Sequence, residues 1–169
     1  MIGLQHLLPP FPSPAALLRP AQWLPHPLLE ALVASATQHL LHDALTDHAL
    51  DLLEGRILAI RILDPDIRLR FTLAQGRIRS ADAGLPDVTI SAAADDLLLL
   101  VAQRADPDTL FFHRRLRIAG DTELGLAVKN VLDTIDLGAL PSALRGALGQ
   151  LADATEHRRT ASRETMMPG

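Results

Sequence analysis

The sequence has no cysteine and no tyrosine, and aromatic residues make up only 3% of its 169 residues. Without cysteine, the chain has no disulfides, thiolate nucleophiles or cysteine-ligated metals, and the cytosol is the expected compartment. Because 48% of the residues are apolar, the core must consist mainly of leucine, isoleucine, valine and alanine. We therefore expect any internal cavity to be aliphatic.

Long apolar runs are also missing. The longest, residues 97–102, is far shorter than the roughly 18 residues that cross a bilayer. The amino-terminal segment lacks the basic start and unbroken apolar stretch of a secretory signal. We expect a cytoplasmic chain that is soluble or peripheral at the inner membrane. A formal net charge of −4 argues against a nucleic-acid partner, because phosphate contacts need a concentrated basic surface.

Prolines are concentrated at the start, where seven of the twelve precede residue 28. Each proline removes a backbone donor and disfavours helix at the preceding residue, so we predict an irregular arm over residues 1–27. The arm also carries many leucines and the single tryptophan, Trp23. This apolar surface needs a partner, which could be the chain's own domain, a second subunit or a membrane.

The hydrophobic periodicity predicts one domain over residues 28–154 and a polar, flexible tail over 155–169. Period-two alternation predicts strands. They span residues 56–63, 66–73, 77–80, 88–91 and 114–118. Helical spacing predicts helices. They span residues 28–45, residues 97–103 with Asp95 as the N-cap, residues from Asp121 or Thr122 onward, and residues 141–154. The expected class is α+β, with helices covering one face of an antiparallel sheet.

One segment is especially distinctive: residues 106–130 read DPDTLFFHRRLRIAGDTELGLAVKN. This string resembles the most characteristic stretch of the UbiT family. Supporting pieces occur in the family order. They are Leu53-Glu-Gly-Arg56, Asp87-Val-Thr-Ile-Ser91, Asp96-Leu-Leu98, Pro141-Ser-Ala-Leu144 and Gln150-Leu-Ala-Asp153. Together these pieces cover residues 28–154.

The resemblance implies a sterol carrier protein type two fold, in which helices and a five-stranded, mostly antiparallel sheet enclose an apolar tunnel. It also implies a non-catalytic accessory role in oxygen-independent ubiquinone biosynthesis, beside the hydroxylating UbiU and UbiV proteins. The expected ligands are polyprenylated quinone precursors or phospholipid, with no other cofactor. A protein-interaction scaffold without lipid cargo is the alternative. A homodimer and contact with a membrane surface both stay open.

An aliphatic tunnel suits an isoprenoid tail, because each buried methylene contributes about 0.8 kcal/mol without needing a directed contact. The candidate lining residues are apolar and come from several predicted elements, and each could equally be ordinary core. They are Phe71, Leu97, Leu100, Phe111, Phe112, Leu116, Leu124 and Val128.

The other groups of polar residues that could suggest a metal site or a catalytic site have simpler interpretations. His39, His42 and Asp43 could begin a metal site, but no spacing of a known zinc motif accompanies them. Asp106, Asp108 and His113 lack a nucleophile motif, and both Asp106 and Asp121 are typical of turn and helix caps. We therefore predict no catalytic residue and no bound metal.

Arginine supplies all but one of the sixteen basic residues. Several arginines alternate with apolar residues along predicted strands, so they should share the solvent face of the sheet. They are Arg68, Arg70, Arg77, Arg79, Arg115 and Arg117. This face could bind anionic headgroups or an acidic protein, or it could only keep the sheet soluble and unpaired.

Overall fold

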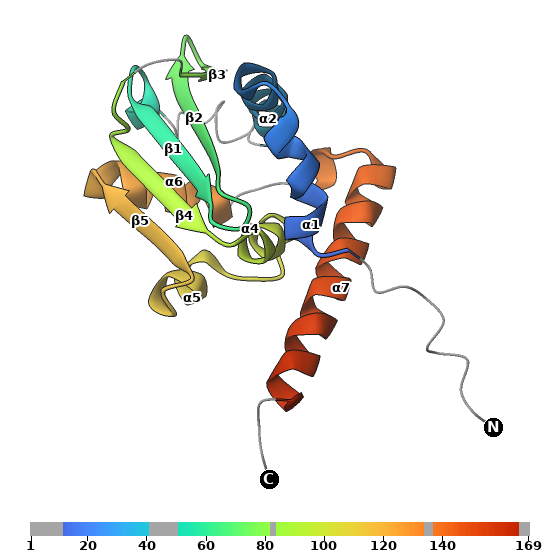
Figure 1. Cartoon of the computed structure of the whole chain (residues 1–169). Helices are drawn as coiled ribbons and strands as arrows, with labels where there is room; N and C mark the ends of the chain where they lie inside the picture. Colours follow the sequence, from blue (N-terminus) through green and yellow to red (C-terminus); the bar gives the residue numbers. More distant parts are fainter. Residues whose placement is uncertain (1–11, 41–50, 82–83, 134–136, 166–169) are drawn as a thin grey trace, which may run out of the picture.

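The computed structural model describes residues 12–40, 51–81, 84–133 and 137–165 (Figure 1). The amino-terminal elements are α1 (Pro14–Leu18), the 3-10 helix η2 (Arg19–Trp23), α2 (His26–Leu40) and η3 (Asp51–Leu53). The strands are β1 (Ile57–Ile62), β2 (Ile67–Ala74), β3 (Arg77–Ser80), β4 (Val88–Ala92) and β5 (Leu116–Gly120). The remaining helices are α4 (Ala94–Val101), α5 (Pro107–Phe112), α6 (Thr122–Asp133), η4 (Leu137–Ala139) and α7 (Ser142–Thr165).

The five strands form one sheet in the order β3-β2-β1-β4-β5. The pairs β1–β2, β2–β3 and β4–β5 are antiparallel, but β1 and β4 are parallel. The predicted antiparallel sheet was therefore wrong at this pair, and the sheet is mixed. After β3 the chain crosses to the far side of β1, so that β4 runs in the same direction as β1.

One face of the sheet is apolar, and the helices gather on that side. Along β2, Ile67, Leu69, Phe71 and Leu73 are buried, while the residues between them are half-buried or exposed. The main core joins β1, β4 and β5 to α4 and α6, which lie behind the sheet in Figure 1. A second cluster joins β2 to α1, η2 and α2. The predicted alternation along β2 is confirmed.

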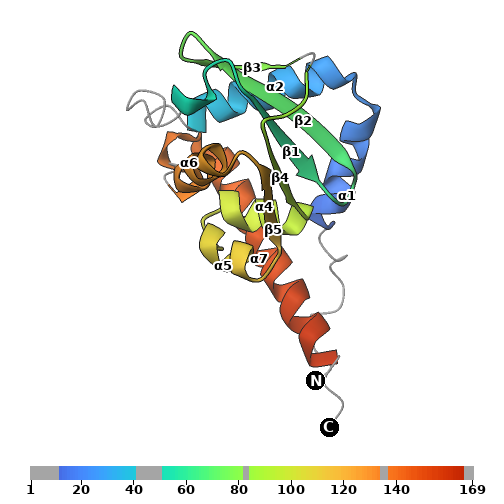
Figure 2. The same ribbon diagram turned by 90° about the vertical axis from the view of Figure 1, so that its left-hand side faces the viewer.

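Helix α2 covers the free edge of the sheet beside β3 (Figure 2). The Glu30 carboxylate accepts from the backbone N–H of Arg70 at 3.1 Å and from the Ser80 hydroxyl. Two turns further along, Gln38 Oε1 accepts from the backbone N–H of Ile78 at 2.9 Å. Uncovered strand edges present such N–H groups to other chains. Side chains of α2 therefore accept hydrogen bonds from N–H groups at the sheet edge that another chain could otherwise bind.

The described part of the predicted irregular arm is largely helical, so that prediction was wrong from α1 onward. Pro14 and Pro20 occupy the first turn of α1 and of η2, where a missing backbone N–H costs nothing. Ser13 caps α1 by accepting from the N–H of Ala16 at 3.1 Å. Leu18 and Ala21 then pack on the cluster beneath β2, so the arm is part of the domain. The first eleven residues of the arm lie outside the described ones.

The carboxyl-terminal region also differs from its prediction. The tail expected from residue 155 continues as α7 to Thr165, and the second half of α7 projects past the rest of the domain (Figure 1). Ala152 and Thr155 are fully buried, and Ala152 packs against Leu99 and Ala102 at the end of α4. These contacts hold α7 in the fold, although its polar sequence suggested fraying.

Helix α4 begins at Ala94, earlier than predicted, so Asp95 is not its cap. Instead, the Asp64 carboxylate accepts from the N–H of Ala94 at 2.8 Å. Asp96 in the first turn of α4 is buried and binds the guanidinium groups of Arg115 and Arg159. This buried carboxylate joins α4 to the start of β5 and to α7.

Candidate functional site

An apolar cavity of about 100 Å³ lies between the apolar face of the sheet and its helices. The strands β1 to β4 form its floor, and α2, η3, α4 and α6 form its walls. Among the described residues that line the cavity, none carries a charge, and only Thr37 and Thr72 carry a hydroxyl group. The lining consists of Thr37, Leu53, Leu58, Ile60, Phe71, Thr72, Leu73, Ile78, Ile90, Leu97, Val128, Val131 and Leu132. It is aliphatic apart from Phe71 and the two threonines.

The predicted lining residues divide into three groups. Phe71, Leu97 and Val128 line the cavity. Leu100, Leu116 and Leu124 are buried in the main core but are not part of the lining. Phe111 and Phe112 are 43% and 77% exposed, so they lie outside the cavity altogether.

Most lining residues were missed by the prediction, although a signal for them was present in the sequence. Leu58 and Ile60 alternate along β1 on the same face as Leu69 and Phe71, which are paired with Ile60 and Leu58. Ile90 lies beside Ile60 through the parallel pairing of β4 with β1. Following the alternation through all the strands would have identified these positions.

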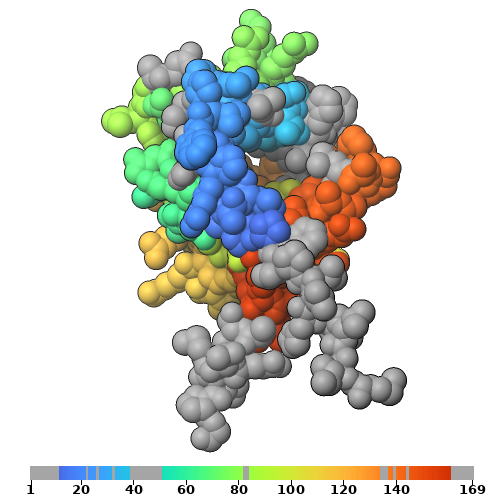
Figure 3. Space-filling view, turned by 45° about the vertical axis from the view of Figure 1, so that its right-hand side comes forward, coloured from blue at the N-terminus to red at the C-terminus, as the bar shows by residue number. Residues whose placement is uncertain are grey.

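The surface beside α2 and the start of α7 is hollowed, as the space-filling view shows (Figure 3). Helix α2 contributes Thr37 to the cavity wall, and α2 also packs close to η4. The walls of the cavity are therefore helices packed on the sheet, whereas its floor is a hydrogen-bonded sheet.

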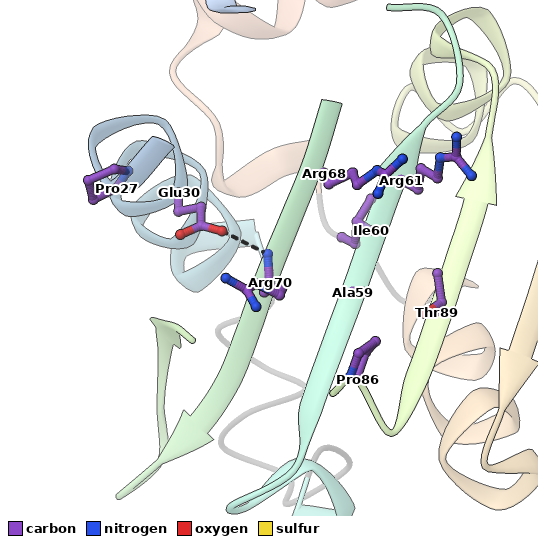
Figure 4. A pocket seen from close by; sticks show the side chains of 9 residues that line it. All are labelled: Pro27, Glu30, Ala59, Ile60, Arg61, Arg68, Arg70, Pro86 and Thr89. Atoms are coloured by element: carbon purple, nitrogen blue, oxygen red, sulfur yellow. Dashed lines mark hydrogen bonds between the residues drawn. The ribbon is translucent and has the colours of Figure 1, made fainter. Parts of the chain in front are cut away.

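The opposite face of the sheet carries arginine (Figure 4). By strand register the face holds six arginines. They are Arg61, Arg68, Arg70, Arg77, Arg79 and Arg117. Part of this face forms an open cavity of about 730 Å³ that extends to Pro27 and Glu30 on α2. The predicted arginine face is thus present, except that Arg115 precedes β5 and binds Asp96 instead.

Asp66 partly neutralises the arginine face. Its carboxylate accepts from Arg61 Nε at 2.8 Å and from an Arg68 guanidinium nitrogen at 3.1 Å. These hydrogen bonds, that of Arg61 foremost, hold the pKa of Asp66 below its usual range. Asp66 therefore offsets part of the positive charge of Arg61 and Arg68.

A third feature is a surface groove of about 300 Å³ between α5, β5 and α6. Phe111 and Phe112 from α5 form one wall, with their rings edge to face and 6.0 Å apart. Leu126 on the outer side of α6 is 55% exposed and faces the same groove. The sequence pattern missed α5, whose six residues are too few to show a helical period.

Residues 36–133 match the family model of the SCP-2 sterol transfer family. The chain is 42% identical over 144 residues to the ubiquinone biosynthesis accessory factor UbiT of Escherichia coli K12, covering 85% of this chain and 83% of that protein. The UbiT protein of Escherichia coli O157:H7 matches equally well.

This chain belongs to the UbiT family and contains an SCP-2 domain. A solved structure of a UbiJ-SCP2 ubiquinone synthesis protein has the same fold, with a TM-score of 0.53, 21% identity, and coverage of 63% of this chain and 95% of that chain. The resemblance predicted from residues 106–130 is therefore confirmed, as is the SCP-2 type of fold.

The acidic residues that could suggest catalysis have structural roles in this SCP-2 domain. Asp106 caps α5 by accepting from the N–H of Thr109 at 2.7 Å, and this bond foremost lowers the pKa of Asp106. Asp121 caps α6 by accepting from the N–H of Leu124 at 3.0 Å, and it also binds Arg56 at 2.6 Å. Both contacts lower the pKa of Asp121, with the backbone hydrogen bond the larger cause. The caps predicted at Asp106 and Asp121 are confirmed.

Asp108 forms an ion pair across the groove. Its carboxylate accepts from Lys129 Nζ at 2.6 Å, and this hydrogen bond raises the pKa of Lys129. His113 ends α5 and is exposed. These groups of the UbiT-family chain are arranged as a cap, an ion pair and a helix end, and not as a nucleophile with its base.

Within the described ranges, no three histidine, aspartate or glutamate side chains gather as a metal site would require. The His39, His42 and Asp43 side chains lie outside the described part of the structure. Among the described helices of this SCP-2 domain, none combines the length and apolar character needed to span a bilayer.

Proposed function

We propose that this chain is a non-catalytic accessory factor of ubiquinone biosynthesis that holds lipid, most specifically the polyprenyl tail of a quinone precursor. The proposal places it in the oxygen-independent branch, beside UbiU and UbiV type hydroxylases, at or near the membrane surface. The name of its 42% identical relative supports the pathway, and the SCP-2 domain supports the lipid.

The apolar cavity is the observation that carries this proposal. Its lining is aliphatic apart from Phe71 and two threonines, and such a surface binds an isoprenoid chain through area alone. An internal void in a close-packed core sacrifices dispersion contacts. A cavity kept in the middle of the core therefore favours a binding role.

The cavity volume sets a further requirement. Sites for drug-sized ligands have volumes of roughly 300–1,000 Å³, whereas this cavity measures about 100 Å³. A full polyprenyl tail therefore requires a helical wall to move away from the sheet. Under this proposal α2 or α6 moves, because the sheet floor is fixed by its backbone hydrogen bonds.

A substitution that fills the cavity tests the proposal. Val128→Phe places a ring in the void, so we expect little loss of folding stability and at least a roughly tenfold loss of polyprenyl-quinone binding. Leu126→Phe is the matched control, because it adds an aromatic ring to the exposed side of the same helix. Quinone uptake by each purified variant is measured by fluorescence displacement and extraction.

Equal uptake by the wild type and both folded variants would contradict binding in this cavity. Uptake lost in Leu126→Phe but retained in Val128→Phe would move the lipid site to the outer groove. Thermal melting of both variants shows whether either has lost its fold.

The exposed groove of Phe111, Phe112 and Leu126 favours a second candidate function, a scaffold that binds the hydroxylases. Exposed aromatic residues are the side chains that most often dominate protein interfaces. If this function holds, Phe112→Ala weakens binding to the hydroxylases by roughly tenfold or more and leaves lipid content unchanged. Unchanged partner affinity in calorimetry would remove the groove from consideration.

A further inference from the structure

The segment from α1 to the start of α2 carries three exposed large apolar side chains close together in the chain. Leu17 on α1 is 45% exposed, Trp23 at the end of η2 is 90% exposed, and Leu28 on α2 is 50% exposed. We call this set the Trp23 corner. Its other face is anchored, because Leu18 and Ala21 pack on the apolar cluster beneath β2. The exposed side chains are therefore held outward by a fixed base.

We propose that the Trp23 corner inserts into the surface of a lipid bilayer and docks the domain there. This inference extends the proposed lipid-holding function by naming the docking surface. The cavity and the corner can nevertheless be tested separately.

Charge supports a lipid partner. The chain has a net charge of −4, yet its first 29 residues contain no aspartate or glutamate, and Arg19 lies within the corner. The first acidic side chain, Glu30, is buried against β2 and β3. The segment itself therefore presents apolar and basic groups, and it contributes no exposed acidic group that would repel anionic headgroups.

The shape and residue type favour a bilayer over a folded protein partner. Trp23 has 90% of its surface exposed, so it protrudes from the domain and does not line a groove. A fluid bilayer accepts such a protruding side chain without a complementary pocket, and tryptophan prefers the interfacial zone between headgroups and acyl chains. Pro20 and Pro25 restrict the backbone on both sides of Trp23, which lowers the entropy cost of binding.

The position of the corner also fits the proposed function. Helix α2 starts at the corner and carries Thr37 in the cavity wall. Docking through the corner brings the first turn of α2, the helix whose last turn lines the cavity, to the membrane surface.

The test uses the chain's own reporter, because Trp23 is its only tryptophan and the chain has no tyrosine. The full-length protein is titrated with vesicles of equal parts phosphatidylcholine and phosphatidylglycerol. We expect the tryptophan emission to shift to shorter wavelength and to be quenched by lipids brominated on their acyl chains. Because the contact is mainly apolar, raising the salt concentration should weaken binding only slightly.

Two variants keep the reporter and change the surface. The double variant Leu17→Asp/Leu28→Asp should bind vesicles at least roughly tenfold more weakly in co-sedimentation. Leu85→Asp is the control, since Leu85 is also 90% exposed but lies in the connection between β3 and β4. It should bind like the wild type. Size-exclusion chromatography and thermal melting verify the fold of each variant.

Several outcomes would overturn the inference. An unshifted emission while the protein still sediments, with binding abolished by salt, would assign docking to the arginine face. Conversion of a dimer to a monomer by the double variant, without any vesicle effect, would assign the corner to a second copy of this chain. Emission already blue-shifted in buffer and unchanged by vesicles would mean that another part of the chain covers Trp23.

The extracted lipid content of the same preparations separates this inference from the proposed function. A protein that purifies without lipid but inserts Trp23 into vesicles contradicts the lipid-holding function and leaves the docking surface standing. A protein that carries lipid but shows no insertion contradicts only the docking surface.

Discussion

At the residue scale, Gly120 makes the junction between β5 and α6 possible. Its φ is +109°, and an added Cβ would lie 2.2 Å from the carbonyl oxygen of Asp87. That same oxygen accepts from the N–H of Asp121 at 2.8 Å. Moving the backbone of Asp87 to relieve the clash would therefore disturb this hydrogen bond. We expect Gly120→Ala to lower the free energy of unfolding by about 2 kcal/mol or more, measured by urea denaturation.

Gly76 provides the control for this prediction. It also has a positive φ of +70°, but no atom lies within 4 Å of an added Cβ. Gly76→Ala should therefore cost less than Gly120→Ala, since it adds backbone strain without a clash. Equal losses would show that the close approach to Asp87 has no energetic importance.

Also at the residue scale, the lowered pKa of Asp121 predicts that the stability of the fold depends on pH. Its pKa is lowered from the usual 3.8 by the N–H of Leu124 and by Arg56. A lowered pKa in the folded state means that the charged carboxylate stabilises the fold above pH 3.8, and that this stabilisation is lost as the pH falls through the folded-state pKa. Asp121→Asn should thus be less stable than the wild type at neutral pH.

The difference in melting temperature between Asp121→Asn and the wild type should shrink as the pH falls below 3.8. Glu123→Gln, which removes the same charge from the same turn of α6, is the control. A difference that stays constant from neutral to acidic pH would contradict the assigned role of the carboxylate.

At the scale of elements, Asp96 connects α4 to α7 and to the start of β5. It is 5% exposed and accepts from Arg115 and Arg159. We expect Asp96→Asn to lower the free energy of unfolding by about 1–3 kcal/mol, because both guanidinium groups lose a charged acceptor. Hydrogen exchange should show faster opening of α7 in this variant.

Asp95 offers the matched comparison in the same turn. Its carboxylate is 3.9 Å from Arg159 and is less buried than Asp96. Because partly exposed ion pairs contribute little, Asp95→Asn should change stability by less than about 1 kcal/mol. If the two variants were equally unstable, burial of Asp96 would not be the cause.

The elements also show what the sequence could and could not predict. The alternation Ile67, Leu69, Phe71 identified β2 because a sheet with one covered face enforces that period. The parallel pairing of β1 with β4 was missed, since alternation gives the face of a strand but not its neighbour. Helix α7 was predicted to end early, because its buried positions Ala152 and Thr155 are small or polar.

The same limit applies to the candidate site. Phe71, Leu97 and Val128, three of the predicted tunnel residues, line the cavity. Phe111 and Phe112 were assigned to the lining on apolar character alone, yet the short α5 turns them toward the surface. Apolar character predicts that a side chain seeks a partner, but only the packing decides whether that partner is the core, a ligand or another molecule.

At the scale of the whole molecule, the sheet separates two different surfaces. Its helix-covered face encloses the apolar cavity, while its open face carries six arginines. The Trp23 corner lies at the beginning of the helix that walls the cavity. This arrangement is consistent with a protein that meets lipid at its surface and holds the lipid tail inside.

The most direct test of this account is native mass spectrometry with organic extraction of the protein purified from its own host. The account predicts one isoprenoid quinone, quinone precursor or phospholipid per chain, lost on denaturation and reduced in the Val128→Phe variant. An empty protein that also fails to take up polyprenyl quinone from detergent or vesicles would contradict the account. The cavity would then be a packing defect of a protein-binding scaffold.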